Sequence, residues 1–413
     1  MPRIAIIGAG IIGLNLAFAC ERRGWDVILI EARSPGYGAS SVNAGWIVPS
    51  HAGPVPAAGL LRTSMRWMLR SDSPLYIRPR LDREMARWLI SFWRNCNAAA
   101  YDTGLAANAE LSRRTFALYD ELAAAGVAFE QHKVGVLFAF MTREKLAHEL
   151  LHMDSLTAFG IDAPEPVFGD DLRELEPALA DQITGGFLMR EERHVRPDSL
   201  VAGLVRYLTD RGVELTTSAK VIGLQTAKGA VVGVETETGR IRADATVIAA
   251  GSWSGELARL AGVRVPIQAG KGYCLDYAPS PVEVRHAIHL HEARAAVTPL
   301  DAFTRVAGTM EFSGINEVIR PERVTAIARA AASSLRNWPA DPAVAKVGSG
   351  LRPMTPDGLP VVGLLPGFSN LAIASGHGML GLTLAPATAD ALAEQLTTGQ
   401  TPEVLRPFDP GRF

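Results

Sequence analysis

Short apolar runs separated by polar turns organise the first part of the chain. Residues 4–7 are four consecutive apolar residues, typical of a strand buried on both faces of a parallel sheet. The pattern then predicts a helix over 11–23, with Gly24 as its stop, and a second apolar strand over 27–30. This order of strand, helix and strand predicts an α/β unit.

The turn between the first strand and the helix is rich in glycine. Gly8, Gly10 and Gly13 form the pattern GxGxxG. The first glycine makes a tight turn, the second lets backbone approach a pyrophosphate, and the third lets the helix pack on the strand. Glu31 ends the second strand, where its carboxylate can accept both hydroxyls of an adenosine ribose and would repel a 2′-phosphate. These residues predict a site for NAD or FAD.

Segment 36–56 has no helical or strand periodicity and is rich in small residues. A nicotinamide dehydrogenase would continue with regular βα repeats, whereas such a loop can lie along an extended cofactor. We therefore expect FAD. In this interpretation Ser40, Ser41 and Asn43 face its phosphates and flavin ring, and Arg33 reaches the adenosine edge.

Later segments return to the same fold. Residues 211–251 contain short β-rich runs between glycine-containing turns and end in an apolar strand over 246–249. Near the C-terminus a turn-rich stretch, a strand and a second glycine-rich bend precede a helix predicted over 380–396. The nucleotide-binding fold is therefore expected to be assembled from separated pieces of chain.

Composition and charge limit the classes of function. The 413 residues suffice for two or more domains, and 41 Lys+Arg against 43 Asp+Glu leave no basic excess for nucleic acid. Cys20, Cys96 and Cys274 form no metal-binding cluster, and the chain opens directly into a strand without a signal segment. We expect a reduced, cytoplasmic protein without a metal site.

Segment 60–95 interleaves tryptophans with arginines. This pattern is typical of helices on a membrane surface, and a buried helix pair whose arginines extend to solvent explains it as well. Peripheral association with the inner face of the plasma membrane therefore stays open.

Taken together, these motifs resemble the D-amino-acid oxidase and glycine oxidase superfamily of flavoproteins, and most closely its bacterial D-amino-acid dehydrogenases. The resemblance covers nearly the whole chain and rests on the GxGxxG turn with Glu31 and on "SSVNAG", "VIAAGSWS", "KGYCLDY", "RVAGTMEF", "GLRPMTPDGLPVVG" and "SGHGMLGLTLAPATA". It implies an α/β (α+β) fold, with a Rossmann-like FAD domain and a substrate domain built on a mixed or antiparallel sheet. The implied boundaries are 1–85, 195–255 and 345–413 for the FAD domain, and 86–194 and 256–344 for the substrate domain.

The resemblance also implies substrate residues. Arg352, in "GLRPM", matches the family arginine that binds the substrate carboxylate bidentately, and Tyr273, in "KGYCL", matches a position near the substrate. A structural ion pair and a core tyrosine are the alternatives. His51 closes the 36–56 loop, where a neutral imidazole would accept a proton from the substrate amine or would bond a loop carbonyl.

The glycine bend around His377 is expected to lie against the pyrimidine end of the flavin. Amides of Gly376, Gly378 and Met379 would offset negative charge there, and His377 itself is either a flavin neighbour or a loop residue. The residues expected to bind FAD are Gly8, Gly10, Ile11, Ile12, Gly13, Glu31, Ala32, Arg33, Ser40, Ser41, Asn43, Ala44, Gly45, Val221, Ala250, Gly251, Arg352, Gly376, His377, Gly378, Met379 and Leu380.

The implied activity is the oxidative deamination of D-amino acids, with hydride transfer from Cα to flavin N5 and electrons passed to a quinone or other carrier. Sarcosine oxidase relatives attach flavin through a cysteine near "GSGLRPMT", but no cysteine lies between Cys274 and Phe413, so non-covalent FAD is expected. The alternatives are D-hydroxyproline or D-proline, glycine or an N-methyl amino acid as substrate, oxygen as acceptor, or an FAD-carrying subunit without catalysis. The oligomeric state is not predicted.

Overall fold

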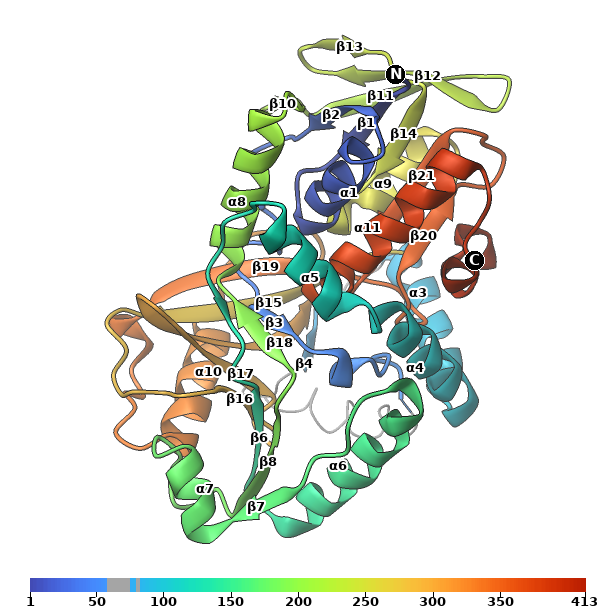
Figure 1. Ribbon diagram of the computed structural model, residues 1–413. Coiled ribbons are helices and arrows are strands. Elements are labelled where there is room, and N and C mark those ends of the chain that lie inside the picture. Colours follow the sequence, from blue (N-terminus) through green and yellow to red (C-terminus); the bar gives the residue numbers. More distant parts are fainter. Residues whose placement is uncertain (58–74, 79–81) are drawn as a thin grey trace.

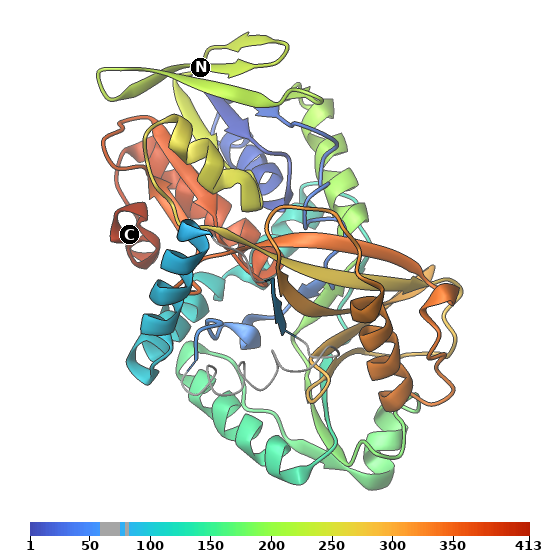
Figure 2. The same cartoon turned by 180° about the vertical axis from the view of Figure 1, so that it is seen from behind.

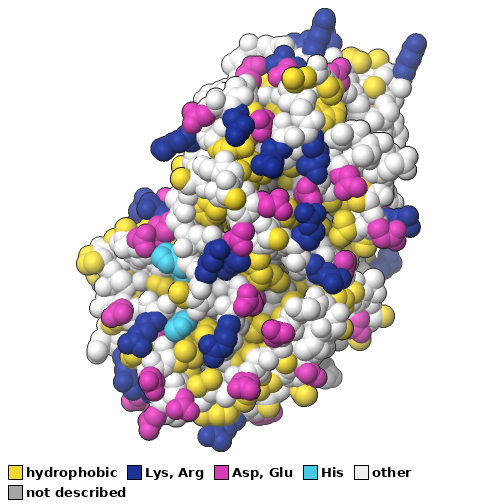
Figure 3. All heavy atoms as spheres, viewed as in Figure 1, with side chains coloured by type: hydrophobic (Ala, Val, Ile, Leu, Met, Phe, Trp, Pro, Cys, Tyr) yellow, Lys and Arg dark blue, Asp and Glu magenta, His cyan; other side chains and the backbone are white. Residues whose placement is uncertain are grey.

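The chain builds two main sheets in the computed structural model, which describes residues 1–57, 75–78 and 82–413. A six-stranded sheet lies toward the end of the molecule that carries the N-terminus, and a nine-stranded sheet lies below it in Figure 1. On the face seen in Figure 3, positive and negative side chains are interspersed, in keeping with a formal charge of −2. The predicted combination of α/β and mixed-sheet architecture is confirmed.

The six-stranded sheet holds the predicted nucleotide-binding strands. Its strands pair in parallel except for the last, which is antiparallel. Their order is β10 (Glu214–Thr216), β2 (Asp26–Ile30), β1 (Arg3–Ile7), β14 (Ala245–Ile248), β21 (Leu371–Ser375) and β20 (Val361–Leu364). Strands predicted over 4–7, 27–30 and 246–249 are therefore present, and they lie side by side although hundreds of residues separate them.

Both faces of this sheet are covered. One core packs the sheet against α1 (Ile11–Glu21), α11 (Gly381–Thr398), α8 (Pro197–Asp210) and α5 (Thr115–Ala124). The other core packs it against α9 (Ser254–Leu260) and the meander β11 (Val221–Ala227), β12 (Ala230–Thr236) and β13 (Gly239–Ile241). Apolar side chains on both faces explain why the strands read as continuous apolar runs.

The nine-stranded sheet is mixed. It runs β19 (Lys346–Met354), β15 (Gln268–Tyr277), β18 (Phe303–Phe312), β17 (Ala295–Leu300), β16 (Ala287–Leu290), β6 (Val136–Phe140), β8 (Gly185–Met189) and β7 (Pro166–Phe168), with β4 (Leu75–Ile77) paired to β18. Helix α10 (Pro321–Ser334) packs on its outer face (Figure 2).

The remaining elements join the two sheets. The loop predicted over 36–56 contains a two-residue strand, β3 (Trp46–Ile47), and a 3₁₀ turn at Pro49–His51. Strand β3 pairs with β9 (Arg193–Val195), which in turn pairs with β5 (Gln131–His132). The other helices among the described residues are α3 (Arg83–Asn95), α4 (Ala98–Ser112), α6 (Arg143–Ser155) and α7 (Gly169–Leu175).

Strand β19 lies in a different sheet from the one that the predicted domain boundaries suggest. The boundaries themselves stay a prediction. Strand β19 pairs with β15 from Gln268↔Met354 to Asp276↔Lys346 and so lies in the large sheet, whereas the predicted boundaries group residues 345–413 with the FAD domain. The chain then crosses to β20 in the other sheet. Arg352 is thereby placed where the chain passes from one sheet to the other.

Segment 60–95 falls partly outside the described residues. Its described part forms β4 and α3, and α3 lies on the outside of the molecule in Figure 2. Among the described residues, none of the helices combines the length and apolar character needed to cross a membrane.

Candidate active site

A cavity of about 1420 Å³ is lined by residues from both sheets. This volume exceeds the roughly 300–1000 Å³ common for small ligands, which suits an extended one. His51 lines the cavity. Most of the residues predicted to bind FAD also line it, namely Gly8, Gly10, Ile11, Ile12, Glu31, Ala32, Arg33, Ser40, Asn43, Ala44, Gly45, Val221, Ala250, Gly251, Arg352, Gly376, His377, Gly378, Met379 and Leu380. The predicted residues that do not line it are Gly13, Ser41 and Tyr273.

The glycine turn has the geometry that its sequence requires. Gly8 has φ +111°, and a Cβ there would lie 2.6 Å from the carbonyl oxygen of Ala249. A Cβ at Gly13 would overlap the carbonyl oxygen of Gly8, so Gly13 acts in packing α1 on β1 and not in lining the cavity. The turn brings the first residues of α1, and with them the positive end of the helix dipole, to the cavity.

Glu31 follows directly after β2, which lies next to β1 in the sheet, and its side chain reaches the glycine turn. Its Oε2 accepts the Ala9 N–H at 2.9 Å and its Oε1 accepts the Arg33 N–H at 2.8 Å. A carboxylate has further lone pairs for ribose hydroxyls, so the site fits the predicted adenosine contact. Arg33 is shared with other groups, since its guanidinium pairs with Glu317 and lies 4.2 Å from the ring centroid of Tyr37.

The small-residue loop is held mainly by its own side chains. The Asn43 amide donates to the carbonyls of Ala39 and Ser40 at 3.1 and 2.9 Å, and its oxygen accepts the Gly45 N–H at 2.7 Å. Ser40 Oγ accepts the Ile11 N–H at 2.9 Å. The Asn43 side chain therefore shapes the loop, and the predicted cofactor role of Ser41 finds no support because Ser41 lies off the cavity.

The bend before α11 offers fewer free amides than expected. The Gly378 N–H donates to the Pro353 carbonyl at 3.0 Å, and the Leu380 N–H donates to the His377 carbonyl at 2.8 Å. Within the described part of the chain the Met379 amide has no such partner and remains available to a ligand. His377 Nε2 lies 3.1 Å from Thr388 Oγ1, and burial lowers the pKa of His377 to about 3, so the imidazole is a neutral loop anchor.

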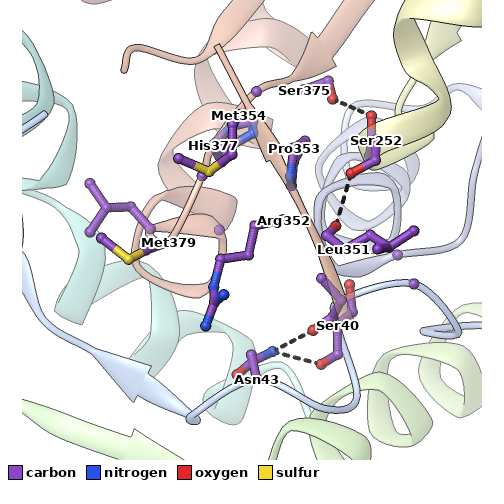
Figure 4. A pocket seen from close by; sticks show the side chains of 18 of the residues that line it. Ser40, Asn43, Ser252, Leu351, Arg352, Pro353, Met354, Ser375, His377 and Met379 are labelled. Carbon is purple, nitrogen blue, oxygen red and sulfur yellow. Dashed lines mark hydrogen bonds between the residues drawn. The ribbon is translucent and has the colours of Figure 1, made fainter. Parts of the chain in front are cut away.

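Arg352 extends from β19 into the cavity (Figure 4). Its Nη1 donates to the Thr309 carbonyl at 3.0 Å and lies 4.0 Å from Met310 Sδ. Among residues 1–57, 75–78 and 82–413, no carboxylate forms an ion pair with it. Burial lowers its pKa to about 10, so the side chain stays charged at neutral pH. Arg352 is half-buried, and a cation partly removed from water without an anion is costly, so the position fits the predicted contact with a ligand carboxylate, which stays a prediction.

His51 belongs to an aromatic cluster that sequence reasoning did not identify. Its ring centroid lies 5.0 Å from Phe138, 5.2 Å from His289 and 5.9 Å from Trp46, and all four residues line the cavity. Burial, and then the nearby His152 and His291, lower the pKa of His51 to about 4, so the imidazole is neutral at pH 7. The alternating histidines of "HLH", His289 in β16 and His291 just after it, were the available signal for His289.

Tyr273 is not brought to the cavity. Gly272 faces Arg352, and because side chains alternate along a strand, Tyr273 points to the opposite face of β15. It is 1% exposed and donates its hydroxyl to Glu311 Oε2 at 2.7 Å, beside an ion pair of 3.1 Å between Lys271 Nζ and Glu311 Oε1. The structure thus places Tyr273 in a buried network that includes Glu311, away from the described lining of the cavity, and its predicted substrate contact stays a prediction.

The burial of Glu192, which bonds the residue before His51, predicts how the stability of the folded protein changes with pH. Glu192 is buried, its Oε1 accepts the Ser50 N–H at 3.0 Å, and burial raises its pKa to about 8. The folded state then holds a proton that the unfolded state releases, so this group's stabilisation is lost as pH rises from about 4.5 to 8. Over that range Glu192→Gln should become more stable than the wild type by up to about 1.4 kcal/mol per pH unit, measured by urea unfolding. Exposed Glu191→Gln is the control, and equal pH slopes for all three proteins would contradict the assignment.

The fold and the cavity define a dinucleotide-binding oxidoreductase. Residues 3–395 match the model of the DAO family, described as FAD dependent oxidoreductase, and the chain belongs to this family. FAD is accordingly its cofactor. A D-amino acid dehydrogenase of Cereibacter sphaeroides (strain ATCC 17029 / ATH 2.4.9) is 34% identical over 97% of this chain and 93% of its own length, and one of Rhizobium rhizogenes is 30% identical over 97% of each.

Solved structures show the same fold at lower identity. Glycine oxidase of Bacillus cereus ATCC 14579 aligns with a TM-score of 0.73 and 24% identity, covering 97% of this chain and 96% of that one. Iminodiacetate oxidase of Chelativorans sp. BNC1 aligns with a TM-score of 0.74 and 22% identity, covering 99% of each. The predicted family and its extent over nearly the whole chain are confirmed.

The cysteines bear on how FAD is held. None of Cys20, Cys96 and Cys274 is among the described residues that line the cavity. Cys20 and Cys274 are buried, and burial raises their pKa values to about 12 and about 11, which suppresses the reactive thiolate. This geometry agrees with non-covalent FAD.

Proposed function

We propose that this protein oxidises D-amino acids to 2-oxo acids and ammonia. The observation that carries the proposal is Arg352, a half-buried guanidinium that lines the cavity and has no acidic partner among the described residues. Its planar fork suits a carboxylate, which every amino-acid substrate offers. A subunit that only stored or relayed electrons would have no need of such a group.

The residues of the chain divide the work as follows. Arg352 holds the substrate carboxylate and so orients Cα, while His51, neutral at pH 7, accepts a hydrogen bond from the substrate amine, which gives up its proton to solvent. Bound FAD supplies the acceptor for the hydride that leaves Cα. The free Met379 amide stabilises negative charge at the cofactor. Loss of one hydride and one proton leaves an imino acid, which water hydrolyses to the 2-oxo acid and ammonia.

The names of the relatives support this proposal, and the names of the solved structures leave other amino acids as alternative substrates. Curated relatives at 34% identity are D-amino acid dehydrogenases, while structures of the same fold include glycine oxidase, iminodiacetate oxidase and an L-proline dehydrogenase of P. horikoshii. An anaerobic panel decides among them. D-Alanine should bleach the flavin absorption band, whereas L-alanine, glycine and sarcosine should not; bleaching by the L-form or by glycine alone would overturn the stereochemical assignment, and D-proline and D-hydroxyproline test the cyclic alternative.

We also propose that a quinone or another carrier takes the electrons at the membrane surface of a cytoplasmic protein. Support comes from α3, where Ile90 and Trp93 are 50% and 58% exposed beside Arg87 and Arg94, and Trp93 also lines the cavity. Trp93→Ala should reduce sedimentation with anionic phospholipid vesicles and reduction of a quinone analogue. Val344→Ala, at an equally exposed residue outside α3, is the control, and vesicle binding that does not change in Trp93→Ala would refute this surface.

A further inference from the structure

We propose that Gly272 and a β-bulge at Thr309 are positioning residues that hold the Arg352 guanidinium in the orientation needed to bind a carboxylate. The inference deepens the proposed function and rests on Arg352 as the carboxylate-binding group. The three residues come from three adjacent strands of the large sheet, β15, β18 and β19, and all three line the cavity or face it.

Gly272 leaves the space that the Arg352 guanidinium occupies. A Cβ built on Gly272 would overlap Nη1, Cζ and Nη2 of Arg352 at nearly equal distances. These short distances mean that the guanidinium occupies the space that a side chain at position 272 would fill, against the backbone of β15. Any side chain at position 272 would displace the group, so the absence of a Cβ is what admits it.

Thr309 fixes the rotation of the same group. The register of β15 against β18 shifts between Lys271 and Tyr273, which marks a bulge, and Thr309 in this bulge has φ +61°. Glycine is the usual residue at a left-handed bulge position, and a β-branched residue there is a strained outlier. The strained backbone directs the Thr309 carbonyl to Arg352 Nη1 at 3.0 Å.

The Thr309 side chain adds a second unfavourable contribution to the free energy of folding. Its hydroxyl is buried, and in the described part of the chain it has no hydrogen-bond partner. Strain and an unsatisfied hydroxyl at one residue are the kind of cost that functional sites retain. Here the backbone carbonyl of Thr309, and not its side chain, makes the useful contact.

Together the two contacts fix the position of the guanidinium but use only part of its hydrogen-bond donors. Of its five N–H donors one is directed to Thr309, and the remaining donors can meet the two oxygens of a carboxylate in one plane. Gly270 offers a natural comparison, because it lies two residues from Gly272 on the same strand face, and a Cβ there would meet the side chains of Met310 and Met354, which are flexible.

The test measures binding of propionate, a carboxylate without the amine, to the FAD-loaded protein by calorimetry. Gly272→Ala should raise the Kd by about tenfold or more, whereas Gly270→Ala should stay within about threefold of the wild type. In an Arg352→Lys background, Gly272→Ala should have little further effect, because lysine has no planar group to displace. Equal Kd values for wild type and Gly272→Ala, or additive effects in the double variant, would overturn the inference.

Two further variants keep the outcome decisive. If Gly272→Ala does not fold, recovery of a folded, FAD-loaded Gly272→Ala/Arg352→Ala protein assigns the fault to the overlap, and continued failure refutes it. Thr309→Gly should raise the Tm and keep propionate binding, since glycine adopts the same backbone without strain; lost binding would show that the side chain, not the carbonyl, matters. If Arg352→Ala itself binds propionate as the wild type does, the proposed function fails, whatever Gly272 does.

Discussion

Arg352→Ala should lower kcat/KM for the D-amino acid substrate by roughly a thousandfold, equivalent to about 4 kcal/mol of transition-state stabilisation. The carboxylate loses its charged, planar partner, so KM rises; Cα is then poorly aligned for hydride loss, so kcat falls as well. Stopped-flow reduction of the flavin under anaerobic conditions separates the two effects, because the limiting rate reports alignment and its half-saturation concentration reports binding.

Arg352→Lys is the matched control for charge. Lysine keeps the positive charge but lacks the fork and the flat face, so we expect a loss that lies between the wild type and Arg352→Ala. FAD content should be determined for each variant, because the same cavity is lined by the residues predicted to bind FAD. Wild-type kinetics in a fully flavinated Arg352→Ala protein would remove Arg352 from the substrate site.

Glu31→Ala should release FAD from the purified protein. The substitution removes the expected ribose acceptor and also frees the amides of Ala9 and Arg33, which Glu31 now binds at 2.9 and 2.8 Å. Each charge-assisted hydrogen bond contributes about 1.5–3 kcal/mol, so we expect FAD affinity to fall by at least a hundredfold. The ratio of flavin to protein absorbance after gel filtration measures this loss.

Glu214→Ala is the control for Glu31→Ala. Glu214 lies in β10 of the same sheet, and its carboxylate, 55% exposed, pairs with Arg3 at the surface. Its removal should leave FAD content unchanged. A Glu31→Ala protein that retains full FAD after dialysis, with substrate kinetics altered instead, would contradict the adenosine assignment.

The nucleotide half of the site was predictable because its determinants are local. Gly8, Gly13 and Glu31 lie within a single strand–turn–helix–strand unit, so their spacing in sequence sets their spacing in space. Helix α11 and the glycine bend before it were predictable for the same reason. The loop at Ser41 and Asn43 was less so, because its small polar side chains were free to turn toward the cofactor or, as for Asn43, toward the loop's own backbone.

The substrate half depended on residues that the chain brings together from afar. Sequence resemblance identified Arg352, but the lack of a carboxylate partner among the described residues follows from which strands surround it. Which face Tyr273 takes depends on a bulge in the pairing of β15 with β18 and on the alternation of side chains along β15, and neither can be read from the motif "KGYCL".

By itself, then, the sequence determined that a dinucleotide binds, since the glycine turn and its acid act through local backbone geometry, and the non-periodic 36–56 segment favoured FAD over NAD. The tertiary structure decided the rest of the site. It placed Gly272 and the Thr309 carbonyl against Arg352, and His289 beside His51, through strand pairing and ring packing between segments distant in the chain. Such contacts depend on register and on backbone conformation, which a linear pattern of residue types does not specify.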